Sequence, residues 1–124
     1  MARSALVVDD SMLIRHTVCR FLEERGFAVE SATNGHEALE LLKSMAPSLI
    51  ITDVNMPKMD GSELIDRIKS DPARAGIPLV VLTGKVSSGE PQPAKADYIV
   101  HKDKDITDQL HRALESILQA EAEN

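Results

Sequence analysis

The 124-residue chain has a single cysteine, Cys19, so an internal disulfide is excluded. Its longest uninterrupted apolar runs, 5–8 and 79–82, hold four residues each, far short of the ~20 that a transmembrane helix needs. Basic residues are fewer than acidic ones, 14 against 20, and the net charge of −6 argues against binding to nucleic-acid phosphates. We therefore expect no membrane contact and no direct nucleic-acid binding, and a protein as the partner.

The first residues, Met1-Ala2-Arg3-Ser4, lack the layout of a signal peptide, so a cytoplasmic location is expected. A length of 124 residues suits one domain that buries its core without disulfides or a structural metal. We predict a single domain over residues 1–124, in which the polar residues 119–124 form a frayed tail or the stub of a linker.

Short apolar runs rich in β-branched residues alternate with stretches of helical periodicity. The runs cover 6–8, 27–29, 49–51, 79–82 and 98–100. Apolar residues at helical spacing predict helices around 14–22, 38–45, 64–68 and 106–117. This pattern is typical of an α/β protein with a doubly wound parallel sheet, whose strands are covered by helices on both faces.

The segment 84–97 is where such a fold normally has its fourth crossover helix. Pro91 and Pro93 would each cost about 3 kcal/mol inside a helix, and Gly89 adds a smaller cost. Val86 is the only large apolar side chain there that could dock a helix on the sheet. We therefore predict that the fourth helix is short or missing.

Polar residues follow the strands at their carboxyl ends, where doubly wound sheets bind ligands. They are Asp9 and Asp10 after the first strand, Asp53 after the third, Thr83 after the fourth, and His101 and Lys102 after the fifth. If the first and third strands are neighbours, about 4.8 Å apart, three carboxylates converge. Two like charges at about 4 Å repel by roughly 4 kcal/mol at an effective dielectric of about 20, so the cluster needs a cation. Mg²⁺ suits carboxylates, a carbonyl, waters and a phosphate oxygen.

Each of these residues also has an ordinary structural interpretation. Asp9 or Asp10 alone could be a helix N-cap, Asp53 could cap a turn, and Thr83 could simply end a strand. Packing and solubility, however, do not require acids, a hydroxyl and a lysine at the same end of four strands. Their conjunction favours a functional site.

Three stretches carry a resemblance to a known family: 7–11 (VVDDS), 53–61 (DVNMPKMDG) and 82–83 (LT). Together they resemble the receiver domains of bacterial two-component response regulators, over nearly the whole chain. The most specific stretch is Asp-x-x-Met-Pro-x-Met-Asp-Gly, and the 30-residue step from Asp53 to Thr83 (83 − 53) fits the family pattern. The resemblance implies the CheY-like, flavodoxin-like fold with strand order 2-1-3-4-5.

The resemblance also implies a function and roles for individual residues. Asp53 is the expected phosphoacceptor, Asp9 and Asp10 bind Mg²⁺ together with Asp53, and the backbone carbonyl of Asn55 completes the protein's ligands. Thr83 would hydrogen-bond the phosphoryl group and report its presence. The expected donor is a sensor histidine kinase or a phosphotransfer protein, and a downstream effector protein would respond. The chain would act as an enzyme only on itself, by promoting its own aspartyl phosphorylation and dephosphorylation.

The chain departs from the family pattern around its phosphate-contacting lysine. Alignment on Tyr98 places His101 in the lysine position, whereas alignment on Lys102 places Ile99 where the family has an aromatic residue. We favour Lys102, because an ammonium on a flexible stem is the better phosphate partner, with His101 assisting when protonated. A solvent-facing His101 is the alternative. Tyr98 is the candidate to move with Thr83, unless Ile99 occupies that position.

Two other functions compete with a phosphorylated switch. A degenerate receiver that binds partners without phosphorylation would fit the unsettled lysine and the missing helix. A Mg²⁺-dependent aspartyl phosphohydrolase is the weaker alternative, because such enzymes have a second acid two residues after the nucleophile and this chain has Asn55.

Overall fold

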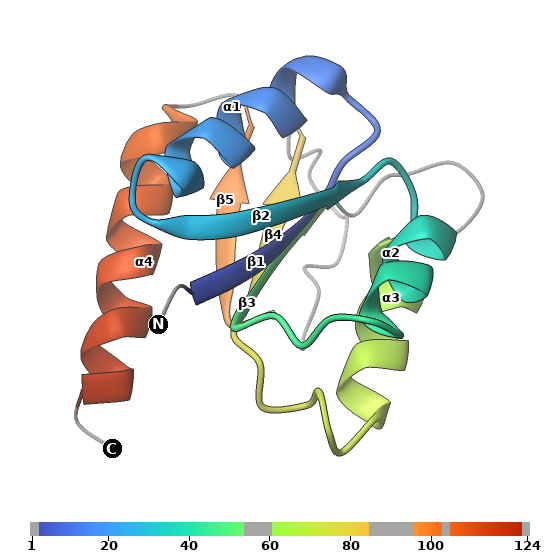
Figure 1. Ribbon diagram of the computed structural model, residues 1–124. Coiled ribbons are helices and arrows are strands. Elements are labelled where there is room, and N and C mark those ends of the chain that lie inside the picture. Colours follow the sequence, from blue (N-terminus) through green and yellow to red (C-terminus); the bar gives the residue numbers. More distant parts are fainter. Residues whose placement is uncertain (1–2, 54–60, 85–95, 103–104, 123–124) are drawn as a thin grey trace, which may run out of the picture.

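The computed structural model describes residues 3–53, 61–84, 96–102 and 105–122 of the chain. Strands and helices alternate along these residues (Figure 1). In chain order the elements are β1 (Arg3–Val8), α1 (Met12–Glu23), β2 (Phe27–Ala32), α2 (Gly35–Leu42), β3 (Leu49–Asp53), α3 (Gly61–Ser70), β4 (Leu79–Thr83), β5 (Tyr98–His101) and α4 (Ile106–Ala122).

The five strands form one parallel sheet in the order β2-β1-β3-β4-β5. This order confirms the predicted fold class. The register pairs Val8 with Thr52, Asp53 with Leu82, and Thr83 with His101. The carboxyl ends of β1, β3, β4 and β5 therefore meet at one edge of the sheet.

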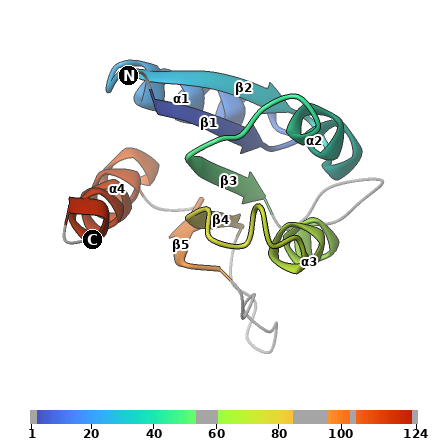
Figure 2. The same ribbon diagram turned by 60° about the horizontal axis from the view of Figure 1, so that its bottom comes forward.

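Alternation along the strands divides the apolar interior into two cores. Odd-numbered residues of β1 and β3, such as Val7 and Ile51, pack with α1 and α4 in one cluster, here called the α1/α4 core. Their even-numbered neighbours, such as Leu6 and Ile50, pack with α2 and α3 in the α2/α3 core. Figure 2 shows the two helix pairs on opposite sides of the sheet. The inner strands β1, β3 and β4 are buried on both faces because successive side chains point to opposite sides and helices cover each side.

Side-chain caps place the first two helices. The Ser11 hydroxyl accepts a hydrogen bond from the Ile14 N–H at 3.3 Å and caps α1 immediately after the two aspartates. Asn34 caps α2 by accepting from the Glu37 N–H at 2.9 Å, and the Glu37 carboxylate accepts in return from the Thr33 N–H. Such reciprocal caps satisfy N–H groups that have no partner within the helix.

Two sequence predictions concern segments at the borders of these elements. The first is the crossover helix between β4 and β5, which was expected to be short or missing. Its segment falls largely on residues 85–95, which lie outside the described residues. Helix α4 continues to Ala122, so residues 119–122 are helical where the sequence suggested a frayed tail. Gln, Ala and Glu are strong helix formers and extend a helix that is already docked on the sheet. No helix in the described part of the chain has the length and apolar character needed to cross a bilayer.

Two leucines of helix α1 give a matched test of the core. Leu22 is fully buried in the α1/α4 core, whereas Leu13 is 74% exposed. We expect Leu22→Ala to lower the free energy of unfolding by about 2–5 kcal/mol, because it removes buried methyl groups and leaves a cavity. Leu13→Ala should change it by no more than about 0.5 kcal/mol. Urea denaturation followed by circular dichroism measures both, and equal losses would contradict this packing.

Candidate functional site

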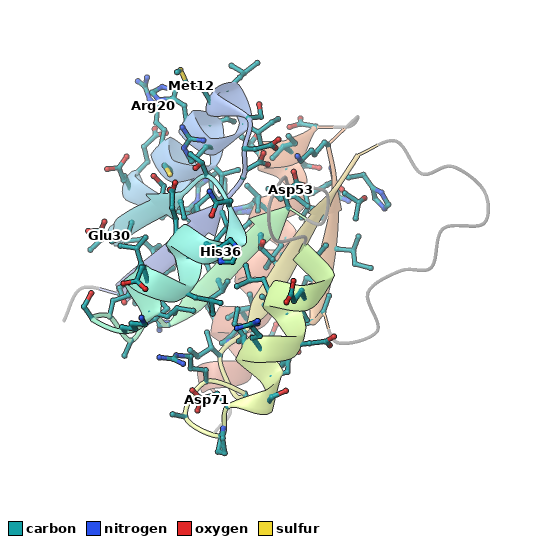
Figure 3. All side chains as sticks on the ribbon, turned by 90° about the vertical axis from the view of Figure 1, so that its right-hand side faces the viewer. Met12, Arg20, Glu30, His36, Asp53 and Asp71 are labelled. Atoms are coloured by element: carbon teal, nitrogen blue, oxygen red, sulfur yellow. The ribbon has the colours of Figure 1, made fainter. Side chains whose placement is uncertain are left out.

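Three aspartates gather at the carboxyl edge of the sheet. Asp53 is the last residue of β3 and Asp9 follows β1, and the two side chains are almost completely buried, at 3% and 0% exposure. Asp10 is exposed at the rim. Each offers one carboxylate oxygen, and these oxygens lie within 4.8 Å of one another. Figure 3 places Asp53 at this upper edge, far from Asp71 at the opposite end of the molecule.

Lys102 supplies a positive charge to this cluster. Its Nζ lies 2.9 Å from Asp9 Oδ2 and 2.9 Å from Asp53 Oδ2. Burial lowers the pKa of the Lys102 ammonium, but the close contacts and negative charges of Asp53 and Asp9 outweigh burial and hold the pKa above its ordinary value. The lysine is therefore charged at neutral pH and offsets the repulsion between two buried carboxylates.

Three hydrogen bonds fix the position of Asp9. Asp9 Oδ1 accepts a hydrogen bond from the Ser11 N–H at 2.8 Å, and the Asp9 N–H donates to the Ala32 carbonyl at 3.1 Å. From helix α1, the Arg15 guanidinium donates to the Asp9 carbonyl at 2.8 Å. Sequence reasoning missed Ser11 and Arg15. The N-cap position of Ser11 was a usable signal, whereas the contact of Arg15 depends on how α1 leaves the sheet.

The donor set fits a hard divalent cation. Asp9 Oδ2 is buried and pairs with the Lys102 Nζ at 2.9 Å, so the lysine already balances part of the negative charge. Carboxylate oxygens contributed by three aspartates are the hard ligands that Mg²⁺ takes. The exposed Asp10 leaves one side of the cluster open to water, which Mg²⁺ keeps in its coordination sphere. Asn55, whose carbonyl was expected among the ligands, lies outside the described residues.

Contacts at the ends of β4 and β5 show which of the two candidate cations, His101 or Lys102, reaches the aspartates. The Lys102 N–H donates to the Thr83 carbonyl at 2.7 Å, which continues the pairing of β5 with β4 by one residue. The Lys102 side chain then reaches the two acids. His101 instead lies beside Thr83, with its Nδ1 3.3 Å from Thr83 Oγ1. The structure therefore brings Lys102, and not His101, to the aspartates.

The structure does not bring Tyr98 to Thr83. Tyr98 pairs with Val80 near the start of β4, and its ring packs against the α1/α4 core. Thr83 ends the same strand, and by alternation its side chain lies on the other face, opposite that of Leu82. Ile99 and His101 are the β5 residues that share the face of Thr83. The expected movement of Tyr98 with Thr83 stays a prediction without a contact to support it.

Gln109 on helix α4 is a further site residue that the sequence did not reveal. Its Oε1 accepts from the His101 N–H at 2.9 Å, and its Nε2 donates to the His101 carbonyl at 2.8 Å. The side-chain amide thereby pairs with the outer edge of β5 as a neighbouring strand would. A glutamine in an amphipathic helix carries no sequence signal, because this contact exists only once α4 packs beside β5.

Comparison with known proteins agrees with this geometry. Residues 5–115 match the family described as the response regulator receiver domain. The chain is 36% identical over 88 residues to the response regulator Rre1 of Synechocystis sp., and 43% identical over 82 residues to a gliding motility regulatory protein of Myxococcus xanthus. It spans only 38% and 11% of the lengths of these two relatives. The chemotaxis response regulator CheY4 of Vibrio cholerae has a similar structure, with a TM-score of 0.84, 31% identity, and coverage of 94% of this chain and 99% of that one.

The ion pairs of Lys102 predict a pH dependence of stability. A lysine whose pKa is raised in the folded state contributes stability that is complete below its unfolded pKa, near 10.5, and is lost as the pH rises through the folded pKa. The free energy of unfolding of the wild type should therefore fall more steeply between pH about 10 and about 12 than that of Lys102→Met. Urea denaturation at a series of pH values measures the difference.

The control is Lys43→Met, which removes a lysine that is 70% exposed at the C-terminal cap of α2. This variant should keep the alkaline pH dependence of the wild type. If Lys102→Met also kept it, the proposed contribution of the Lys102 ion pairs to stability would be wrong.

Proposed function

The chain belongs to the response regulator receiver domain family, and on that premise we propose that it accepts a phosphoryl group on Asp53 and signals through the resulting change in its surface. The observation that carries the proposal is the Lys102 ammonium at 2.9 Å from both Asp9 and Asp53. A nucleophilic carboxylate beside a buried cation is the arrangement that phosphoryl transfer needs, because its catalysis is mainly positioning and charge neutralisation.

The chain's own residues account for the chemistry of the transfer. An oxygen of the Asp53 carboxylate forms a bond to phosphorus, and the bond from phosphorus to the donor's leaving group breaks. The product is an acyl phosphate that carries more negative charge than the carboxylate it replaces. Lys102 can bond a phosphoryl oxygen from its present position beside Asp53. The hydroxyl of Thr83, at the end of the neighbouring strand, would donate to another.

Asp9, Asp10 and Asp53 would hold a Mg²⁺ ion, with the Asn55 carbonyl as a further expected ligand. When bound, the ion would neutralise charge on the phosphoryl oxygens that otherwise repel the attacking carboxylate. The chemistry of three carboxylates, one of them exposed to water, supports Mg²⁺ over a softer metal. Because Asp9 and Asp53 are buried, the attraction between the ion and their carboxylates would be stronger than in water.

Receiver domains interact with histidine kinases and effector proteins, and we assign partners of the same kinds to this chain. The donor would be a phosphohistidine on a sensor histidine kinase or on a phosphotransfer protein. The domain is a signalling domain, and its catalysis is limited to its own aspartyl phosphorylation and dephosphorylation. A degenerate receiver was suggested by the unsettled lysine and by the missing helix, and the contacts of Lys102 weaken the first of these two arguments.

Intact mass spectrometry tests the phosphoacceptor. The wild-type chain, incubated with Mg²⁺ and acetyl phosphate, should gain one phosphoryl group, and Asp53→Asn should gain none because the amide is no nucleophile. Glu40→Gln is the matched control, since it removes an exposed acid of α2 whose carboxylate pairs with Lys43 at the surface. It should be modified like the wild type. An adduct that persists in Asp53→Asn would refute the assignment, and a wild type that takes no adduct would favour the degenerate receiver.

Thermal unfolding tests the metal separately. A ligand that binds only the folded state raises the free energy of unfolding by about 2.7 kcal/mol at a concentration of about 100 times its Kd. Mg²⁺ should therefore raise the melting temperature of the wild type and of Glu40→Gln. It should raise that of Asp9→Asn by much less, because a buried ligand is lost. Equal shifts in all three proteins would exclude these aspartates as the metal site.

A further inference from the structure

The side chains of Thr83 and His101 form a hydrogen bond that the proposed phosphoryl transfer does not use. The two residues are register partners on β4 and β5, and Thr83 Oγ1 lies 3.3 Å from His101 Nδ1. Thr83 is 8% exposed, so water competes little for its hydroxyl. When the neutral ring carries its proton on Nε2, the Thr83 hydroxyl donates to Nδ1. In this arrangement the Thr83 hydroxyl donates its single proton to His101 and has none left for another acceptor.

The main chain of His101 is fixed independently of its ring. The Gln109 amide bonds both the N–H and the carbonyl of His101, at 2.9 and 2.8 Å. Gln109 Nε2 also donates to the Asp105 carbonyl at 3.2 Å, next to the start of α4. His101 is therefore held by α4 through its backbone and by Thr83 through its ring.

We propose that His101 is a positioning residue that holds the Thr83 hydroxyl in the unphosphorylated state and is released from it, with its ring free to turn, when the phosphoryl group takes that hydroxyl. The inference rests on the proposed phosphorylation of Asp53 and adds a residue that opposes it and responds to it. It gives Thr83 a partner on β5 whose ring can respond to the phosphoryl group, although Tyr98 lies on the other face of the sheet.

The mechanism is a competition for one proton. A hydroxyl has one hydrogen to donate, so Thr83 cannot donate to His101 and to a phosphoryl oxygen at the same time. The charged phosphoryl oxygen is the stronger acceptor, so phosphorylation breaks the bond to His101. The freed imidazole then rotates about its side-chain bonds, because its backbone stays bonded to Gln109. Loss of the Thr83 bond opposes phosphoryl binding in the wild type, and that opposition is measurable.

Two near-isosteric substitutions separate this role from simple packing. Asn carries a polar atom at the position of the His101 Nδ1, whereas Leu carries a carbon there. His101→Asn should keep the bond to Thr83, and His101→Leu should abolish it. The probe is beryllium trifluoride, a phosphoryl analogue that binds a carboxylate oxygen, titrated in the presence of Mg²⁺ and followed by amide NMR.

His101→Leu should bind the analogue about threefold to tenfold more tightly than the wild type, because the competing hydrogen bond is gone. His101→Asn should stay within about twofold of the wild type. In the Thr83→Val background, which lacks the hydroxyl, His101→Leu should have no effect on affinity. This double-mutant cycle isolates the pairwise interaction from any general effect of the ring.

Three results would overturn the inference while the proposed function stands: unchanged affinity in His101→Leu, an equal effect in the Thr83→Val background, or a His101→Asn variant that behaves like His101→Leu. Failure of the wild type both to take an acetyl phosphate adduct and to bind the analogue would overturn the proposed function and this inference with it. If His101→Leu does not fold, His101→Ala removes the same ring nitrogen and is judged by the same criteria.

Discussion

The site depends on one lysine, which follows the edge strand β5 and bridges two buried carboxylates on other strands. Lys102 follows β5, whereas Asp53 ends β3 and Asp9 follows β1, with β4 lying between β5 and β3. With strands about 4.8 Å apart, the lysine stem must cross β4 to reach both acids. The hydrogen bond from the Lys102 N–H to the Thr83 carbonyl fixes the backbone from which this side chain extends. The contact therefore requires the register of four strands at once.

Charge balance at this edge links stability to signalling. In the resting protein, Lys102 offsets the repulsion between Asp9 and Asp53, whose burial makes that repulsion strong. A phosphoryl group or a divalent ion changes the charge that Lys102 has to balance. Any such change acts on residues at the ends of neighbouring strands, because Thr83, His101 and Lys102 are connected through hydrogen bonds. The same interaction that stabilises the edge would therefore make it respond to the proposed phosphorylation.

The rigid part of the molecule lies directly beneath this edge. Two apolar cores hold the strands from both faces, so the strand ends are fixed while the residues beyond them are held by individual polar contacts. Arg15 and Ser11 hold the loop of Asp9, and Gln109 holds the end of β5. A local change of charge can therefore rearrange the edge without disturbing the packing of the sheet. Separation of a packed scaffold from a polar rim is typical of functional sites on α/β folds.

Much of this protein was determined by local sequence. The apolar runs, the helical spacing and the polar residues at the strand ends predicted the α/β sheet, because strand ends and periodicity are local properties. They also brought together one candidate site of Asp9, Asp10, Asp53, Thr83, His101 and Lys102. The choice between His101 and Lys102, the face on which Tyr98 lies, and the contacts of Arg15 and Gln109 were decided only by the tertiary structure. Each depends on strand register or on helix packing, where a shift of one residue moves a side chain to the opposite face.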